Sequence, residues 1–155
     1  MPELPRQSSG LSKKPNLAFL DSNVFIYGRL EDCNSRLLIF LAQLGEFEVV
    51  TSELVLEEVE RFFRQEVSRE AGYLARRLVE SLAKVVRRQE ITKDLMRLKG
   101  KIKERDLENL AVVRHLDLKY VVSYDSDYSK ARIREYITPR LFVKMFDLEP
   151  YKTEY

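Results

Sequence analysis

Short apolar runs that end abruptly in polar residues occur three times along the chain. Leu17 to Leu20 stops at Asp21 to Asn23, which is the pattern of a fully buried strand that ends in polar groups. Glu48 to Thr51 predicts a second short strand, and a third, Val121 to Ser123, runs into Tyr124 to Asp127. Buried parallel strands of open α/β sheets deliver ligand-facing residues at their carboxyl ends, so we expect a functional edge where these runs stop.

Stretches with helical periodicity lie between these runs. Ser52 is placed to cap one of them, and the stretch that begins near Arg105 is apolar nearly all round, which predicts a largely buried helix. A linker is expected near Thr92, and the alternation of strands with helices predicts a mostly parallel sheet. The predicted helices are Ser35 to Leu44, Ser52 to about Gln65, Ala71 to Arg88 and about Arg105 to Leu116, and a last extended piece at Ile137 to Pro139 precedes a C-terminal helical turn.

The composition suits a packed domain, because 45% of the 155 residues are apolar while Gly and Pro number only 5 each. Residues 1–15 contain few large apolar groups, so we predict a flexible leader and a single domain over residues 16–155. The single cysteine, Cys33, excludes an internal disulfide. No apolar stretch is long enough to span a bilayer or to form a signal peptide, so we expect a cytoplasmic protein without a membrane partner.

Basic residues gather in the middle of the chain, although the net charge is only +2. They are either the solvated faces of helices or an electrostatic track for RNA phosphates, and both interpretations stay open at this point. In the second case, the residues that we expect to bind RNA are Arg61, Arg64, Lys99, Lys101 and Lys103.

Acidic residues mark two of the predicted strand ends. Asp21 and Asp125 each follow an apolar run, so a parallel sheet would gather their carboxylates at one edge. Carboxylates that share a cleft repel one another, and such a cluster usually implies a bound cation. Mg²⁺ and Mn²⁺ prefer oxygen ligands and keep water and substrate phosphate as further ligands. The pattern therefore favours phosphodiester chemistry at a site for Mg²⁺ or Mn²⁺.

Helical geometry indicates which glutamate joins the two aspartates. In the helix that follows Ser52, the apolar stripe is centred between Val55 and Val59. Glu57 lies almost opposite this stripe, and Glu60 lies on its other flank. Glu58 lies roughly 90° from the centre of the stripe, at the boundary between core and solvent. Glu58 is therefore the expected cleft residue.

Asp106 begins the largely apolar helix near the end of the chain. A helix N-terminus favours an anionic side chain, so Asp106 could serve a metal if this end opens onto the same cleft. Its separation of 19 residues from Asp125, 125 minus 106, leaves room for the helix and one strand. Glu104 and Glu108 lie within one helical turn of Asp106 and remain alternatives.

Three segments, Phe19 to Ile26, Thr51 to Val59 and Val121 to Tyr128, resemble the best-marked stretches of PIN domains in order and in spacing. The resemblance covers Leu17 to about Phe146, and it implies a three-layer α/β/α sandwich around a mostly parallel central sheet. The basic stretch between Glu66 and Lys103 looks longer than its counterpart in the smallest members of the family. Substrate specificity is therefore not carried over.

The same resemblance assigns roles to individual side chains. It implies that four acids hold Mg²⁺ or Mn²⁺ and carry the catalysis, and that Asp127 is a further acid at the metal. Asn23 and Ser123 would hold ligands or metal-bound water through hydrogen bonds. The four acids are Asp21, Glu58, Asp106 and Asp125.

The expected reaction is hydrolysis of a phosphodiester bond in single-stranded RNA by water activated at the metal, without a covalent enzyme intermediate. Two other classes of function stay open, namely a non-catalytic RNA- or protein-binding module and a phosphatase for small phosphate esters. Metal-dependent RNA cleavage would distinguish the nuclease from both the binding module and the phosphatase. Because many PIN proteins are toxins of toxin–antitoxin pairs and others process ribosomal RNA, the resemblance implies RNA as substrate and a protein antitoxin or a second copy of the chain as possible partners.

Overall fold

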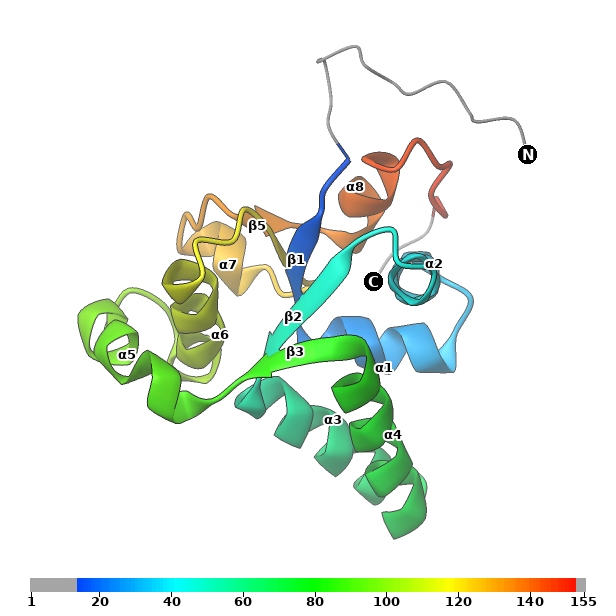
Figure 1. The fold of residues 1–155 in the computed structure, drawn as a ribbon, viewed down its shortest axis with the longest axis horizontal. Coiled ribbons are helices and arrows are strands. Elements are labelled where there is room, and N and C mark those ends of the chain that lie inside the picture. The colour runs from blue at the N-terminus through cyan, green and yellow to red at the C-terminus, as the bar shows by residue number, and fades with distance from the viewer. Residues whose placement is uncertain (1–13, 153–155) are drawn as a thin grey trace.

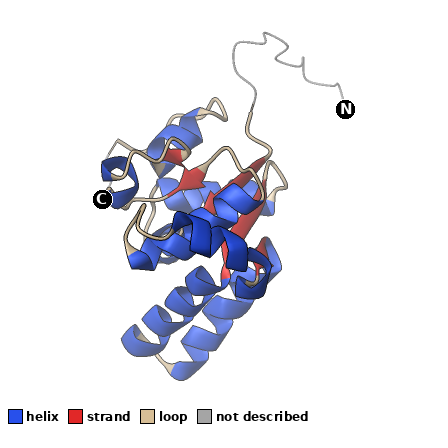
Figure 2. Cartoon of the chain, turned by 90° about the vertical axis from the view of Figure 1, so that its left-hand side faces the viewer, coloured by secondary structure: helices blue, strands red, loops and turns tan. Residues whose placement is uncertain are grey.

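The computed structural model describes residues 14–152. Within these residues, five strands form one parallel sheet in the order β3-β2-β1-β4-β5 (Figure 1). Helices lie on both sides of the sheet (Figure 2), which confirms the predicted α/β/α architecture. The strands are β1 (Leu17–Leu20), β2 (Glu48–Ser52), β3 (Ala83–Val86), β4 (Val121–Val122) and β5 (Tyr136–Ile137).

The helices follow the strands along the chain, and the loops between them are short. None of the helices within residues 14–152 is both long and apolar enough to cross a membrane. Most of the predicted leader lies outside the described residues, although Pro15 at its end is buried. The helices are α1 (Ser22–Leu30), α2 (Asn34–Gln43), α3 (Glu53–Glu66), α4 (Arg69–Leu82), the 3₁₀ turn η1 (Arg88–Ile91), α5 (Thr92–Leu98), α6 (Glu104–His115), α7 (Asp127–Lys130) and α8 (Pro139–Lys144).

The carboxyl ends of β1 and β4 lie side by side, because the two strands pair in parallel with Leu20 opposite Val122. The backbone N–H of Asp21 donates to the Val122 carbonyl at 3.0 Å, which extends this pairing by one residue. The chain leaves β1 toward β2 on one side of the sheet, whereas β4 joins on the other side. The strand order therefore switches between β1 and β4, and open α/β sheets bind their ligands at such a point.

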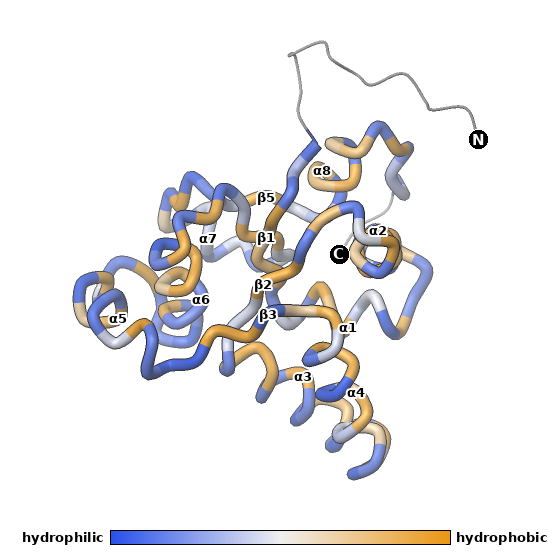
Figure 3. Tube along the Cα trace, viewed as in Figure 1, coloured by the Kyte–Doolittle hydropathy of each residue, from blue (hydrophilic) through white to orange (hydrophobic). Residues whose placement is uncertain are grey.

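Local sequence features account for the helices around this edge. Ser52 caps α3 as predicted, because its hydroxyl accepts a hydrogen bond from the Val55 N–H at 3.1 Å. Helix α6 is buried from Asp106 to Val113, as its apolar pattern predicts. Helices α3 and α4 form a hairpin along which hydrophobic and hydrophilic segments alternate (Figure 3). Gly72 allows their close approach, since a Cβ atom there would lie 2.9 Å from the Glu60 carbonyl oxygen.

Two predictions for the middle of the chain are wrong. The stretch Ala71 to Arg88 is not one helix, because α4 ends early and Ala83–Val86 pairs with β2 as strand β3. Its apolar spacing suits either a helix or a strand, and the pairing with β2 decides between them. In place of the expected linker near Thr92, the chain forms η1 and then α5. Ile91 of η1 and Leu98 of α5 enter the core.

Candidate metal centre

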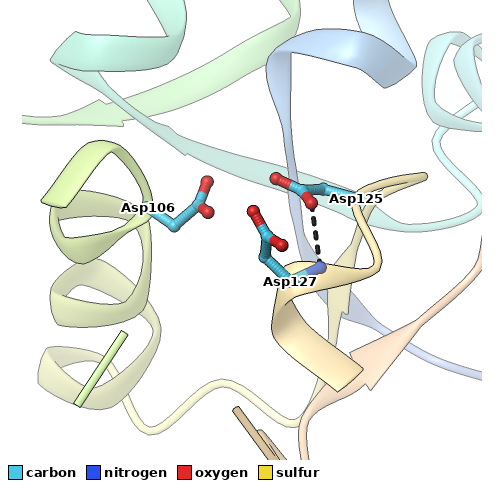
Figure 4. A group of neighbouring side chains, drawn as sticks. All are labelled: Asp106, Asp125 and Asp127. Carbon is cyan, nitrogen blue, oxygen red and sulfur yellow. Dashed lines mark hydrogen bonds between the residues drawn. The ribbon is translucent and has the colours of Figure 1, made fainter. Parts of the chain in front are cut away.

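Three carboxylates converge beside the carboxyl ends of β1 and β4. Asp106 comes from the first turn of α6, Asp125 from the loop after β4 and Asp127 from the start of α7. One ligand atom from each lies within 4.8 Å of the others (Figure 4). The loop is held locally, because Asp125 Oδ1 accepts a hydrogen bond from the Asp127 N–H at 2.9 Å. This arrangement offers a hard cation at least three oxygen ligands.

Asp106 is the most perturbed member of this cluster. Burial, with smaller contributions from the charges of Asp125 and Asp21, raises its pKa to about 7. Its Oδ2 atom is buried and has no hydrogen-bond partner among the described residues. A buried carboxylate oxygen without a donor is costly unless a cation neutralises it. The donor set therefore fits Mg²⁺ or Mn²⁺.

Asp21 is held by neutral donors on several sides. It is the N-cap of α1, and its Oδ1 accepts hydrogen bonds from the Ser22 N–H at 2.7 Å and from Asn109 Nδ2 at 3.2 Å. Its Oδ2 accepts from the Ser123 hydroxyl at 2.7 Å. Burial raises the pKa of Asp21, the hydrogen bonds lower it in part, and the nearby charge of Asp125 raises it further.

Ser123 and Asn23 tie the two strand ends together. The Ser123 hydroxyl donates to Asp21 and accepts from the Asp125 N–H at 2.9 Å and from Asn23 Nδ2 at 3.1 Å. The side-chain oxygen of Asn23, Oδ1, accepts a hydrogen bond from the Tyr124 backbone N–H at 3.2 Å. Asp21 is thus linked to the three-carboxylate cluster through one serine, although it is not one of the three closest ligands.

Glu58 lies at the other flank of Asp21. Its side chain is half-buried on α3, near Ser22 and Asp21. Burial is the main cause of the raised pKa of Glu58, and the charge of Asp21 is the second. The two neighbouring glutamates face elsewhere, because Glu57 pairs with Arg88 and Glu60 pairs with Arg76.

The two alternatives to Asp106 take other positions. Glu104 is exposed. Glu108 points toward α3, where its carboxylate accepts from the Leu54 N–H at 2.9 Å and pairs with Arg88 at 2.6 Å. Glu108 therefore acts as a capping anion for α3 from another helix.

Asn109 is a site residue that the sequence reasoning missed. It lies on α6, three residues after Asp106, and is 1% exposed. Its side-chain nitrogen, Nδ2, donates to Asp21 and to the Tyr128 hydroxyl, each at 3.2 Å. Its side-chain oxygen, Oδ1, accepts from the Ser52 hydroxyl at 2.7 Å. The available signal was an amide residue three positions after Asp106, which puts it one helical turn from the acid on the same side of α6.

The predicted RNA-binding residues divide into two groups. Arg61, Arg64, Lys99 and Lys101 have exposed side chains, and Arg64 lies 3.7 Å from Glu60. Lys103 instead reaches the cluster, where its Nζ lies 3.1 Å from Asp127 Oδ2. A second cation, Arg105, reaches both Asp125 and Asp127 and was not anticipated.

Comparisons with known proteins bear on the family and the fold. The family model described as PIN domain matches residues 18–133. Among solved structures, a toxin–antitoxin complex from Klebsiella pneumoniae has a TM-score of 0.60 at 18% identity and covers 79% of this chain and 97% of its own. VapBC2 from Rickettsia felis, bound to a promoter DNA fragment, has a TM-score of 0.58 at 18% identity, with coverages of 79% and 96%. Mycobacterium tuberculosis VapC20, described as a Sarcin-Ricin loop cleaving toxin, has a TM-score of 0.56 at 18% identity, with coverages of 74% and 94%. A search of curated proteins gives no match.

Proposed function

The chain belongs to the PIN-domain family, and on this premise we propose that it is a metal-dependent endoribonuclease that hydrolyses phosphodiester bonds of single-stranded RNA. One observation carries the proposal. Asp106, Asp125 and Asp127 bring three carboxylate oxygens within 4.8 Å at the switch point of a parallel sheet, and one buried Asp106 oxygen lacks a hydrogen-bond donor. This is an environment for a hard divalent cation.

The proposed ligands of Mg²⁺ or Mn²⁺ are these three aspartates together with Asp21 and Glu58 on their flank. When bound, such an ion lowers the pKa of the attacking water and stabilises negative charge on the phosphate. The protein's own part is to hold the acids in place. Ser123, with Asn23 behind it, holds Asp21 and the backbone of Asp125 at fixed distances, so that the carboxylates need little rearrangement. Glu58 can take up a proton at its carboxylate, because its pKa is raised.

An RNA substrate agrees with the charges near the site. Lys103 and Arg105 lie directly beside the cluster, and Arg61 adds positive charge near Glu58. Basic side chains attract the phosphate backbone of nucleic acid, whereas a phosphatase for small esters has no need of an extended basic surface. The Mycobacterium tuberculosis neighbour is described as a toxin that cleaves an RNA loop, which supports the same substrate class.

The test is incubation of the purified protein with a pooled RNA library in Mn²⁺ or in chelator. We expect cleavage in Mn²⁺ alone, with 5′-phosphate and 3′-hydroxyl ends. Asp21→Asn and Glu58→Gln should each lose at least 100-fold in rate, on the order of one catalytic interaction. Glu46→Gln is the matched control, because Glu46 is an exposed carboxyl on the turn after α2. Cleavage that persists in chelator, or that the two site variants retain, contradicts the proposal.

We further propose that the chain is the toxin of a toxin–antitoxin pair and is held inactive in the cytoplasm by a protein antitoxin. The structural neighbours from Klebsiella pneumoniae and Rickettsia felis are toxin–antitoxin complexes. The chain also carries an apolar groove of about 420 Å³ between helices α1 to α4, which suits a peptide segment. Its lining includes Phe25, Ile39, Phe40, Val59, Phe63 and Leu78.

The groove can be tested in the organism that makes the protein. We expect the tagged chain to purify with a small protein that suppresses its RNA cleavage, and Leu78→Glu to lose that protein while keeping cleavage. Leu78 is 37% exposed and lines the groove, so the charge can be introduced there without burying it. Recovery of the tagged chain as an active nuclease without an inhibitor would contradict this role.

A further inference from the structure

Two basic residues stand at the N-terminus of α6, where a helix disfavours cations. Lys103 is the N-cap residue of α6, and Arg105 is the second residue of the helix. The partial positive charge of a helix N-terminus attracts anions and repels cations. A local arrangement that opposes this preference indicates a function that compensates for it.

The contacts of the two side chains lead directly to the carboxylate cluster. Lys103 Nζ lies 3.1 Å from Asp127 Oδ2. Arg105 Nη2 lies 3.3 Å from Asp125 Oδ2 and 3.7 Å from Asp127 Oδ2. The charge of Asp125 is the main cause of the raised pKa of Arg105. Two positive charges thus pair with two carboxylates of the cluster.

These ion pairs are loosely held. The side chains of Lys103 and Arg105 are both 67% exposed, and exposed ion pairs are weak because water competes for both charges. Arg88, which contacts α6 through Glu108, provides a contrast. Its guanidinium bonds to Glu57 and Glu108, and its backbone N–H donates to Glu53, so it is fixed in place. Among the described residues, Lys103 pairs with one carboxylate, and Arg105 makes one hydrogen bond, to Asp125, and a longer contact of 3.7 Å to Asp127.

We propose that Lys103 and Arg105 form an exchangeable phosphate clamp, which pairs with Asp125 and Asp127 and turns to RNA phosphates when these carboxylates bind a divalent cation. This inference rests on the proposed function. A divalent cation and the two basic side chains compete for the same carboxylates. The positive charge of the cation also repels the positive charges of Lys103 and Arg105. The long stems of both residues allow their charges to swing away while the backbone of α6 stays in place.

The chemistry of the two groups fits a phosphate as their second partner. The planar guanidinium of Arg105 can donate two hydrogen bonds to phosphate oxygens, and the ammonium of Lys103 adds a compact charge beside it. Metal binding therefore frees two phosphate ligands at the mouth of the site. RNA binding and metal binding become positively coupled through these side chains, and the coupling acts equally in both directions.

The experiment measures metal affinity and RNA affinity separately in the variant Lys103→Gln/Arg105→Gln. Titration calorimetry without RNA gives the Kd for Mn²⁺, and cleavage at saturating Mn²⁺ and low salt gives KM and kcat. The matched control is Lys93→Gln/Lys119→Gln, which removes the same charge from two exposed lysines on α5 and after α6. The control should change every value by less than about twofold, since exposed charges at a distance are screened.

The clamp predicts effects of opposite sign. Mn²⁺ should bind about 3- to 10-fold more tightly to the double variant, because two competing cations are gone. KM for RNA should rise about 10-fold with kcat little changed, because phosphate contacts are lost. Arg105→Lys alone keeps the charge, so it should keep the parental Mn²⁺ affinity while raising KM modestly.

Two results would overturn the clamp. Unchanged or weaker Mn²⁺ binding in the double variant would mean that the two cations do not compete with the metal, and an unchanged KM would mean that they do not contact RNA. A merely structural role predicts weaker binding of both ligands and a lower melting temperature. If the parent chain itself binds no Mn²⁺ or cuts no RNA, the proposed function fails, which is a separate and recognisable outcome.

Discussion

Replacement of Asp106 by asparagine should stabilise the protein in the presence of chelator at pH 8. Asp106 is 4% exposed, its Oδ2 has no hydrogen-bond partner among the described residues, and Asp125 and Asp127 lie close by. Asparagine has nearly the same size and carries no charge. The substitution therefore removes the repulsion and the desolvation of a buried carboxylate, while the packing of α6 is preserved.

The expected magnitude follows from the pKa of Asp106. The ordinary pKa of this carboxyl is 3.8, and its pKa in the folded chain is about 7. Once the group is ionised, this difference destabilises the folded state by about 4 kcal/mol. A buried amide that lacks a full set of partners costs about 1–3 kcal/mol. The net gain for Asp106→Asn at pH 8 is therefore about 2 kcal/mol.

The sign of the pH dependence is specific. Because the folded pKa of Asp106 is raised, the folded state binds this proton more tightly than the unfolded state does. The parent therefore loses stability as pH rises from about 4 to 7 and loses no more from this group above pH 7. The advantage of the variant should be about 2 kcal/mol at pH 8 and should nearly vanish at pH 5, where Asp106 is protonated in the folded parent.

Urea unfolding followed by circular dichroism, in chelator at pH 5 and pH 8, measures both differences. Saturating Mn²⁺ should reverse the order at pH 8, because the parent gains binding free energy that the variant largely lacks. A variant that is less stable than the parent at pH 8, or whose gain is the same at both pH values, would refute the reasoning.

Three further substitutions test contacts that hold the fold together. Arg114→Gln should lower the free energy of unfolding, measured by urea unfolding, by about 3 kcal/mol. The reason is that Glu135, which is 7% exposed, loses its two hydrogen bonds to Arg114 at 2.7 and 3.2 Å. An effect below about 1 kcal/mol would mean that water replaces the arginine. Gly72→Ala should lower the free energy of unfolding by about 1–3 kcal/mol and speed hydrogen exchange in α3 and α4, because the new methyl group meets the Glu60 carbonyl oxygen. Unaltered exchange would show that the two helices move apart without cost. Asn109→Ala should cost about 2 kcal/mol by removing bonds to three side chains, and a melting temperature equal to that of the parent would contradict its linking role.

Features with a local cause were predictable from the sequence. The strands β1 and β4 were predicted because each is a short apolar run that stops at polar residues. The Ser52 cap and the burial of α6 were predicted because capping and amphipathicity depend on residues within a few positions of each other. Strand β3 was missed for the opposite reason, since its four residues become a strand by pairing with β2.

The acidic cluster shows the same division. The sequence by itself determined that Asp21 and Asp125 end their apolar runs and that Asp106 opens a buried helix, because these are properties of short segments. Only the tertiary structure decided which groups meet these acids. Arg105 pairs with Asp125, and Asn109 bridges Asp21 to Tyr128, because α6 packs beside the junction of β1 and β4. The physical reason is that hydrogen bonds and ion pairs act over a few ångströms in space, so partners separated by 20 or 88 positions in the sequence are brought together only by the fold.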